Sequence, residues 1–378
     1  MKVALITPFP PYRGGISKHS ENLYKELSSR SVLKIYNYTR QYPNLFFPGK
    51  SQYLENVNVN TAYNSVRMID SINPLTWKRV ADDIIKNDFN KVIFRYWNPF
   101  FIPCYISIIN SLRNSIRDIQ IFAICDNIIP HEHFYIHKYL IRMFIKKLDG
   151  VVVLSDSVKD ELLQIVKGCN YKKLFLPIVE NLGEHLDYKF SKKQLKLDEN
   201  KITFLFFGLI RRYKGLDILL SSLNKLNKTQ LDKIEVIIVG EAYDKIESYK
   251  NILTKETSEN VKWVTEYIPD NKINLYFSAT DYVVLPYRSA SQSAIIPMAY
   301  HFNKPVIVSN LQGLIELVEH NISGYIFTNN NIEELAEVLF TCIEKYNRIE
   351  SMQESIKKFK HQLSTKKFVD DLIIFLNE

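Results

Sequence analysis

Phe206 to Asp217 reads F-F-G-L-I-R-R-Y-K-G-L-D, and this stretch joins two segments of different hydrophobic period. The apolar run Ile202 to Phe207 predicts a buried strand, and Leu216 to Leu226 has leucine and isoleucine at helical spacing. A strand, a short cationic loop and a helix N-terminus together form an anion site, because backbone N–H groups and the helix dipole attract phosphate. A solvated basic turn is the alternative interpretation. The loop contains two glycines and three cations: Gly208, Gly215, Arg211, Arg212 and Lys214.

The composition is that of a globular protein with a large core. The chain has 378 residues, which favours two domains, and it is 46% hydrophobic and 24% charged. Its net charge of +8 and pI of about 9.0 favour anionic partners, which include nucleotide phosphates, anionic lipid and nucleic acid. No RNP, helix-turn-helix or zinc-finger pattern is present, so we expect no nucleic-acid partner.

The cysteine spacing and the first residues indicate a reducing compartment. No two cysteines form a C-x-x-C pair, which argues against structural zinc and a disulfide framework. The run Met1 to Ile6 is too short for a secretory signal, and no window approaches the roughly 20 apolar residues that span a bilayer. We therefore expect a cytoplasmic protein. The four cysteines are Cys104, Cys125, Cys169 and Cys342.

The first half of the chain alternates strand-like and helix-like segments, which predicts a parallel sheet with helices on both faces. Between Arg40 and Val66 the chain is polar and poorly periodic, so we expect loops there with at most one short strand. The predicted strands are Val3–Thr7, Leu33–Tyr36, Lys91–Tyr96, Gln120–Cys125 and Gly150–Leu154. The predicted helices are Ser17–Leu27, Pro74–Lys86, Ile102–Leu112, Tyr139–Lys147 and Ser157–Val166.

Three predicted strand ends carry polar or aromatic clusters, at the sheet edge where ligands of such folds gather. Gly14 and Gly15, after the first strand, allow close approach of a ligand or relieve a tight turn. The third cluster offers groups for acid, base or hydrogen-bonding roles, or it is a polar surface loop. The clusters are Pro8–Gly15, Trp97–Phe100 and Asp126–His133, the last containing Asp126, His131, Glu132 and His133.

The His131 and His133 pair also raises the question of a metal site. No second cluster of ligands completes such a site. The chain also lacks an Asp-x-Asp motif, the usual anchor for a metal that bridges to a diphosphate. We therefore expect no metal.

The segment Leu176 to Ile202 breaks the alternation and predicts an interdomain link. A second strand and helix series follows without repeating the sequence of the first, so we expect two doubly wound α/β domains. The helix Lys366 to Leu376 has apolar positions that favour docking back onto the first domain. The predicted boundaries are 1–180, 181–362 and 363–378. The second series comprises Ile202–Phe207, Ile218–Leu226, Ile234–Val239, Val261–Trp263, Ile273–Phe277, Asp281–Leu285, Ala294–Tyr300, Pro305–Val308, Leu314–Val318, Gly324–Phe327 and Ile332–Tyr346.

Seven segments, in order and at the right spacing, make the whole chain resemble the GT-B-fold glycosyltransferases, specifically retaining family 4. Each segment is moderately specific by itself. Two further segments, Trp97–Phe100 and Asn127–Glu132, resemble a bacterial polysaccharide-assembly branch of that family. The seven segments are Pro11–His19, Gly208–Gly215, Val239–Glu241, Thr265–Asp270, Asp281–Tyr287, Lys304–Val306 and Gly313–Glu316.

The resemblance implies two Rossmann-like domains that face a cleft, with a nucleotide-sugar such as a UDP- or GDP-sugar in the second and the acceptor in the first. Arg211 and Lys214 would bind the diphosphate and stabilise its departure without a metal, and the Gly15 N–H would contact it from the first domain. No cofactor and no protein nucleophile are implied. The remaining donor contacts would be Gly208, Glu241, Ile268, Ser293, Ala294 and Ile295, and the acceptor contacts His19 and Trp97.

The chain departs from the family pattern at two places. The family has two glutamates eight residues apart that hold the donor sugar and ribose, and here Ala290 and Met298 occupy these positions. One of the residues 291–293 is a candidate substitute for the first glutamate. A histidine expected after the fifth strand is replaced by Asp126, while His131 follows five residues on. Either one is a candidate for the sugar-facing role.

We therefore expect a retaining hexosyltransferase that acts on a glycan or lipid-linked acceptor in the assembly of surface polysaccharide or lipopolysaccharide. The missing glutamates motivate a second hypothesis, a catalytically silent scaffold or nucleotide-binding subunit. An epimerase or phosphorylase on the same fold is a third. A basic helix is compatible with an anionic membrane surface at the inner membrane, or with a solvated helix face. Its cations are Lys138, Arg142, Lys146 and Lys147.

Overall fold

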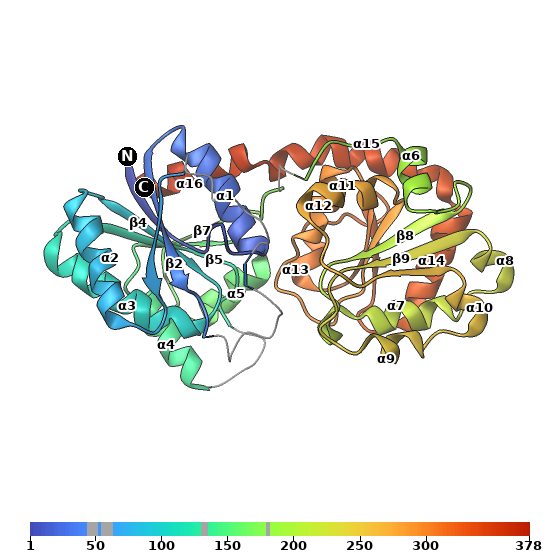
Figure 1. Cartoon of the computed structure of the whole chain (residues 1–378), viewed down its shortest axis with the longest axis horizontal. Coiled ribbons are helices and arrows are strands. Elements are labelled where there is room, and N and C mark those ends of the chain that lie inside the picture. The colour runs from blue at the N-terminus through green and yellow to red at the C-terminus, as the bar shows by residue number, and fades with distance from the viewer. Residues whose placement is uncertain (44–51, 54–62, 130–134, 179–181) are drawn as a thin grey trace. The chain divides into compact units, whose positions relative to one another are not determined.

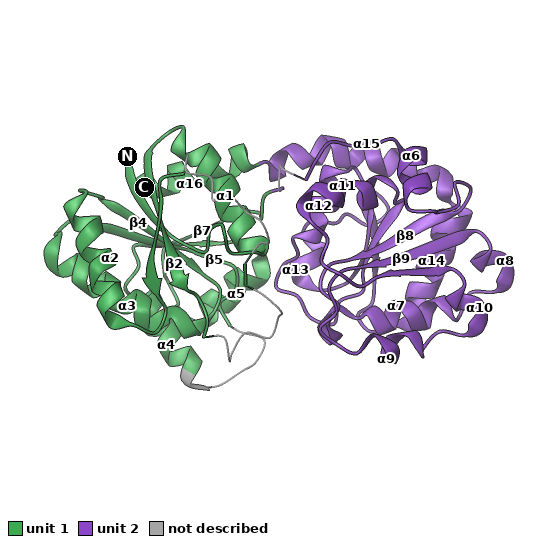
Figure 2. Ribbon diagram, in the orientation of Figure 1, with its two compact units in different colours: residues 1–177, 365–378 green, residues 178–364 purple. Residues whose placement is uncertain are grey.

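The structure is a computed structural model that describes residues 1–43, 52–53, 63–129, 135–178 and 182–378 (Figure 1). The chain forms two compact units, coloured separately in Figure 2. Unit 1 comprises Met1–Pro177 together with Thr365–Glu378, and unit 2 comprises Ile178–Ser364.

Unit 1 is built on a seven-stranded parallel sheet with the strand order β3-β2-β1-β4-β5-β6-β7. Its strands are β1 (Lys2–Ile6), β2 (Val32–Arg40), β3 (Ser65–Asp70), β4 (Lys91–Tyr96), β5 (Gln120–Cys125), β6 (Gly150–Val153) and β7 (Tyr171–Lys173). Its helices are α1 (Gly15–Ser28), α2 (Pro74–Lys86), α3 (Ile102–Ser115), α4 (Tyr135–Ile145), α5 (Asp156–Ile165) and α16 (Thr365–Asn377).

Alternating side chains of these strands feed two apolar layers, one on each face of the sheet. Ala4 and Ile6 of β1 belong to the layer that contains buried residues of α2, α3, α4 and α5. Val3 and Leu5 belong to the other layer, which contains buried residues of α1 and α16. Both faces are therefore covered, as a parallel sheet requires.

The helix α16 completes the second of these layers. Phe368, Leu372 and Phe375 are buried among residues of β1, β4, β5 and β6, and α16 also contacts α1. An ion pair between Arg30, two residues beyond the end of α1, and Asp370 of α16 adds a contact at the exposed side. The last helix of the chain is thus part of the same core as its first strand (Figure 2).

Unit 2 contains a six-stranded parallel sheet with the order β10-β9-β8-β11-β12-β13. Its strands are β8 (Ile202–Phe207), β9 (Ile234–Val239), β10 (Val261–Val264), β11 (Tyr282–Leu285), β12 (Val306–Ser309) and β13 (Gly324–Phe327). Its helices are α6 (Tyr188–Gln194), α7 (Leu216–Leu223), α8 (Lys228–Leu231), α9 (Ile246–Lys250), α10 (Lys255–Ser258), α11 (Asp270–Ser278), α12 (Ile295–His301), α13 (Gln312–Ile315), α14 (Ile332–Glu344) and α15 (Ile349–Phe359).

The predicted class, two doubly wound parallel-sheet domains, is confirmed. Several elements were not predicted, among them β7, α6, α15 and the short helices α8, α9 and α10. The strand β7 has three polar residues at the sheet edge, and α6 lies in the segment that we predicted to be a link. The helix α6 buries Ser191 and Lys192 and is capped by the Asp187 side chain, so it shows no apolar period. The helix α15 buries only Ile349, Met352 and Ile356.

Candidate functional site

Each sheet reverses its strand order at one place, between β1 and β4 in unit 1 and between β8 and β11 in unit 2. In open parallel sheets, ligands bind where the loops leave the carboxyl ends of two such strands in opposite directions. In unit 2 the candidate residues fall on these loops: Gly208 to Gly215 follows β8, and Pro286 to Ala294 follows β11. In unit 1, Asp126 follows β5, the neighbour of β4.

Two glycines shape the loop that follows β8 in unit 2. Gly208 has φ of +108°, and a Cβ atom there would lie 2.8 Å from Nζ of Lys214. Gly215 has φ of +65°, and a Cβ atom there would collide with the carbonyl oxygen of Pro286. The first glycine therefore makes room for an ammonium group, and the second allows the loops after β8 and β11 to touch.

Lys214 is a buried cation whose ammonium group lies over an aromatic ring. It is the last residue of a short 3₁₀ helix, Arg212–Lys214, and only 9% of its surface is exposed. Its ammonium lies 5.1 Å from the ring centroid of Tyr287. Within the described part of the chain, no carboxylate pairs with it. Burial lowers the pKa of Lys214; Tyr213 opposes this shift, and the charge of Arg211 adds to it.

Arg211 also rests on an aromatic ring. Its guanidinium carbon lies 4.5 Å from the centroid of Tyr243, in the loop that follows β9. That loop is fixed by two backbone hydrogen bonds, Ile210 N–H to the Glu241 carbonyl at 2.9 Å and Tyr243 N–H to the Ile210 carbonyl at 3.1 Å. No carboxylate among the described residues pairs with Arg211. No carboxylate of the described residues therefore neutralises the charge of this pair of cations.

A neighbouring arginine shows the usual arrangement. Arg288, which follows β11, donates from both terminal nitrogens to the two carboxylate oxygens of Asp217, each at 2.6 Å. Its backbone N–H also donates to the carbonyl of Tyr213 at 2.7 Å. This ion pair connects the segments that follow β8 and β11. Neither Arg211 nor Lys214 takes part in it.

The segment Ser293 to Ile295 approaches the same place. Ile295 Cδ1 would lie 3.7 Å from a Cβ atom at Gly208, and its backbone N–H donates to Ser293 Oγ at 3.2 Å. Burial raises the pKa of Tyr287, and the nearby Ser293 hydroxyl opposes this rise. Tyr287 thus lies close to both Lys214 and this segment.

The other predicted donor residues take different positions. Ala294 caps α12, and Glu241 is buried directly after β9, beside Gly240. Ile268 is buried just ahead of α11. The two positions at which the resemblance leads us to expect glutamate, Ala290 and Met298, are half-buried.

In unit 1, Asp126 forms a buried ion pair. Its Oδ2 accepts from Nε of Arg95 at 2.6 Å, and its Oδ1 accepts from Nη2 of the same residue. Arg95 is 1% exposed and Asp126 is 7% exposed. Because the guanidinium occupies both carboxylate oxygens, a substrate hydroxyl has to compete with it for Asp126.

His19 is the third member of this cluster. Arg95 Nη1 donates to Nδ1 of His19 at 2.6 Å, and burial lowers the pKa of His19 well below its usual value, as does the neighbouring Arg95 charge. His19 lies one turn after Gly15, the first residue of α1, and the first turn of that helix carries no acidic residue. The structure therefore brings together His19 and Asp126 through Arg95.

Trp97 lies in an aromatic cluster after β4. Its ring centroid is 4.4 Å from that of Phe101, and its Nε1 donates to the Tyr42 hydroxyl at 2.9 Å. Phe100, at the outer side of the cluster, is 37% exposed. The predicted residue His131 lies outside the described residues.

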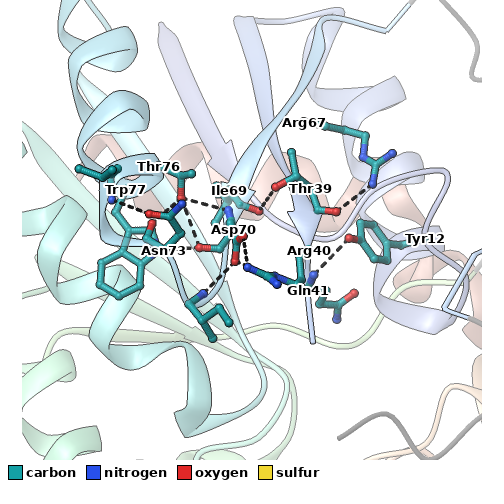
Figure 3. Close-up of polar contacts among 12 residues, drawn as sticks. Tyr12, Thr39, Arg40, Gln41, Arg67, Ile69, Asp70, Asn73, Thr76 and Trp77 are labelled. Carbon is teal, nitrogen blue, oxygen red and sulfur yellow. Dashed lines mark hydrogen bonds and ion pairs between the residues drawn. The ribbon is translucent and has the colours of Figure 1, made fainter. Parts of the chain in front are cut away.

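The end of β2 supports the loop that follows β1 (Figure 3). The Tyr12 hydroxyl accepts from the Gln41 N–H at 3.1 Å, and Arg67 lies 5.7 Å from the Tyr12 ring. Arg40 pairs with Asp70, whose carbonyl accepts from the Trp77 indole. These cations are paired inside the unit, so we assign them a structural role.

The described residues contain no group of three His, Cys, Asp or Glu side chains arranged to hold a metal ion. Over the same residues, no helix has both the length and the apolar character needed to cross a bilayer.

Sequence reasoning missed three residues of these sites. Arg95 lies within a strand that is otherwise apolar after Lys91, and all six residues of that strand are buried. A charge in such a strand requires a partner, and this was a usable signal for the pair with Asp126. Tyr243 and Tyr287 gave no signal, because contact between a ring and a cation depends on loop geometry.

Comparisons with known proteins agree with this architecture. Residues 187–359 match the family model described as glycosyl transferases group 1. An uncharacterized glycosyltransferase of Methanocaldococcus jannaschii is 22% identical over 386 residues, covering 96% of this chain and 94% of the relative.

Solved structures share the fold over nearly the whole chain. Sucrose-phosphate synthase from Thermosynechococcus elongatus has a TM-score of 0.76 at 15% identity, covering 100% of this chain and 99% of that one. Anabaena HepE, solved with UDP-glucose, scores 0.72 at 16% identity and 99% coverage of both chains. WaaG, a glycosyltransferase involved in lipopolysaccharide biosynthesis, scores 0.71 at 13% identity, covering 98% and 99%. The chain thus has the GT-B fold of these solved structures, and residues 187–359, within its second unit, match the glycosyl transferases group 1 model.

Proposed function

We propose that this chain is a retaining glycosyltransferase, of hexosyl type, that transfers a sugar from a nucleotide diphosphate to a glycan or lipid-linked acceptor. Unit 2 binds the donor, with Arg211 and Lys214 on the diphosphate, and unit 1 binds the acceptor. The donor class is supported by the relative solved with UDP-glucose, and the setting in surface-polysaccharide assembly by the lipopolysaccharide glycosyltransferase of similar fold.

The observation that carries the proposal is the buried, unneutralised Lys214. Burying a cation without a counter-charge is costly, so folded proteins normally pair it. Here the ammonium lies over the ring of Tyr287, and a second cation, Arg211, is close enough to lower its pKa. An anionic ligand supplies the missing charge, and a diphosphate gives each cation a phosphate oxygen.

The same arrangement explains how the chain accelerates transfer. When the bond from the sugar to the diphosphate breaks, negative charge grows on the leaving oxygen. Cations that are already positioned stabilise that charge more than they stabilise the intact donor, and this difference lowers the barrier. The proposal assigns this role to Arg211 and Lys214 and requires no metal ion.

The silent-scaffold hypothesis predicts no such arrangement. A scaffold has no need for buried cations without partners, because they weaken the fold. Loss of the two glutamates at Ala290 and Met298 instead leaves the ribose and sugar to other groups. Ser293, whose hydroxyl accepts from the Ile295 N–H and lies near Tyr287, is the candidate that the geometry favours.

Nucleotide affinity tests the proposal directly. We expect UDP or another nucleoside diphosphate to bind the wild-type protein in calorimetry, and Lys214→Met and Arg211→Met to weaken binding at least tenfold each. Arg212→Ala is the matched control, because Arg212 is an exposed cation of the same turn. Transfer should persist in excess chelator, and NMR of the product should show the anomeric configuration of the donor.

Unchanged affinity in both variants would exclude the assigned diphosphate site. Loss of transfer in chelator, restored by a divalent cation, would exclude the metal-free mechanism. A protein that binds the nucleotide but turns over no donor, with a panel of glycan and lipid-linked acceptors, would favour the scaffold.

We also propose an anionic membrane surface as a partner, through α4. Its exposed face combines three cations with Tyr139, 67% exposed, and Met143, 37% exposed. Apolar side chains flanked by cations favour the interface of an anionic bilayer. The cations are Lys138, Arg142 and Lys146.

Sedimentation with vesicles tests this surface. We expect the protein to pellet with vesicles that contain phosphatidylglycerol and to be released by salt. Lys138→Glu with Arg142→Glu should abolish pelleting. Lys78→Glu with Arg79→Glu, the same charge change on the exposed face of α2, should not. Equal pelleting of both variants would contradict the assignment.

A further inference from the structure

The contact between Arg95 and His19 fixes which imidazole nitrogen carries the proton. An arginine side chain only donates hydrogen bonds, so Nδ1 of His19 accepts the bond from Nη1 of Arg95. Burial and the same guanidinium lower the pKa of His19, so the ring is neutral at pH 7. A neutral ring with an unprotonated Nδ1 carries its proton on Nε2.

This Nε2–H group is a buried donor without a hydrogen-bond acceptor among the described residues. His19 is only 4% exposed, and an unsatisfied buried donor is costly. The ring of Phe368 stands against the imidazole at 89° with centroids 5.3 Å apart, and it offers no lone pair. Side chains of a helix lean toward its N-terminus, so His19 extends toward the turn that begins at Gly15.

We propose that His19 donates its Nε2–H hydrogen bond to a substrate oxygen bound at unit 1, and that Arg95 is the positioning residue that makes this nitrogen a donor. The inference rests on the proposed function, because it takes the substrate of unit 1 to be that of a glycosyltransferase. It assigns His19 a fixed donor role. His19 is then not the base that removes the acceptor proton, because its other nitrogen is engaged by Arg95.

Two substrate oxygens share this chemistry, a hydroxyl of the acceptor glycan and a phosphate oxygen of the donor. Both accept a hydrogen bond from a neutral imidazole. The N-terminus of α1, four residues earlier, favours an anion through its free N–H groups, whereas Trp97 and its aromatic neighbours suit a sugar ring. Separate affinities for the two substrates distinguish them.

Nitrogen NMR of the full-length protein tests the tautomer without substrate. We expect the His19 ring, assigned by its loss in His19→Gln, to be neutral at pH 7, with its proton on Nε2. A proton on Nδ1, or on both nitrogens, overturns the inference. In Arg95→Met with Asp126→Leu, which removes both buried charges together, the tautomer preference should decrease.

Kinetics test the substrate contact. The amide of glutamine can accept from Arg95 and donate near the place of Nε2, whereas leucine can do neither. We therefore expect His19→Leu to raise one KM about tenfold, the scale of one lost hydrogen bond, and His19→Gln to recover most of this loss. A raised KM for the acceptor assigns the oxygen to the glycan. A raised KM for the nucleotide-sugar, with weaker UDP binding, assigns it to the phosphate.

The two proposals fail in different ways. If His19→Leu lowers only the melting temperature and leaves both KM values unchanged, the contact is structural and this inference is wrong, while the donor site stands. If Arg211 and Lys214 prove dispensable for nucleotide binding, the proposed function is wrong, while the NMR result for His19 stands.

Discussion

Arg95, near the carboxyl end of β4 in unit 1, and Lys214, in the loop that follows β8 in unit 2, are both buried cations, but their surroundings differ. Arg95 donates to both oxygens of a buried carboxylate and to an imidazole. Lys214 has an aromatic face and no carboxylate among the described residues. Residues of unit 1 satisfy the first cation, whereas the proposed diphosphate would satisfy the second. Burial alone therefore does not identify a functional cation, and the presence of an internal partner decides the assignment.

The largest expected effect is on the stability of unit 1. Arg95→Met leaves Asp126 as a buried carboxylate without its partner, so the free energy of unfolding should fall by about 3–5 kcal/mol. Adding Asp126→Leu removes that charge and should restore most of the loss. Denaturant titration measures both. If Arg95→Met alone were as stable as wild type, Arg95 and Asp126 would not neutralise each other. Arg95 would then not differ from Lys214 in having an internal partner.

Unlike Arg95→Met, Lys214→Met should reduce activity strongly without reducing stability. Turnover should fall about 10²–10³-fold, because a preorganised charge on the leaving group is lost. The free energy of unfolding without nucleotide should rise or stay unchanged, because an unpaired buried charge is removed. Steady-state rates and thermal melts measure these quantities. A large loss of stability in this variant would show that Lys214 has a structural partner.

The pH dependence of stability should separate the same two cations. The pKa of Lys214 is lowered in the folded protein, so between that value and 10.5 the unfolded chain binds more protons. The free energy of unfolding should therefore rise with pH across this window and level off above pH 10.5. The total rise should be about 1.4 kcal/mol for each unit by which the pKa of Lys214 is lowered.

Lys214→Met should lack this contribution when the unfolding free energies of the two proteins are subtracted. Lys304, whose pKa is lowered by burial to about 8, adds a similar rise to both proteins and cancels in the difference. A difference curve that is flat from pH 7 to 10.5 would contradict the unpaired state of Lys214.

The smallest expected effect concerns the aromatic support of Arg211. Tyr243→Leu should raise the KM for the nucleotide-sugar about two- to fivefold, since an exposed contact between a cation and a ring contributes about 0.5–1 kcal/mol. Tyr243→Phe keeps the ring and should behave like wild type. If leucine and phenylalanine have equal effects, the ring does not position Arg211.

The sequence was sufficient to predict the fold and the proposed role of Lys214, but not that of Arg95. The apolar run Ile202–Phe207 and the glycines around Arg211 and Lys214 predicted the strand, the loop and its cations, because local periodicity and turn chemistry determine them. For Arg95, the sequence predicted only a place in the strand Lys91–Tyr96. Its partners, His19 and Asp126, are 76 and 31 residues away in the chain, and such contacts arise from strand order, which local patterns do not encode. The aromatic rings under the two cations were missed for the same reason.

The position of α16 has a consequence for how the protein is made. Its buried side chains complete a layer over strands at the start of the chain, so unit 1 lacks that cover until residues 365–377 have been synthesised. Unit 2 is continuous, from Ile178 to Ser364, so all of its residues precede α16. Until α16 has docked, one face of the first sheet lacks part of its apolar cover, so the nascent unit 1 should be the part of the chain that most needs protection by chaperones.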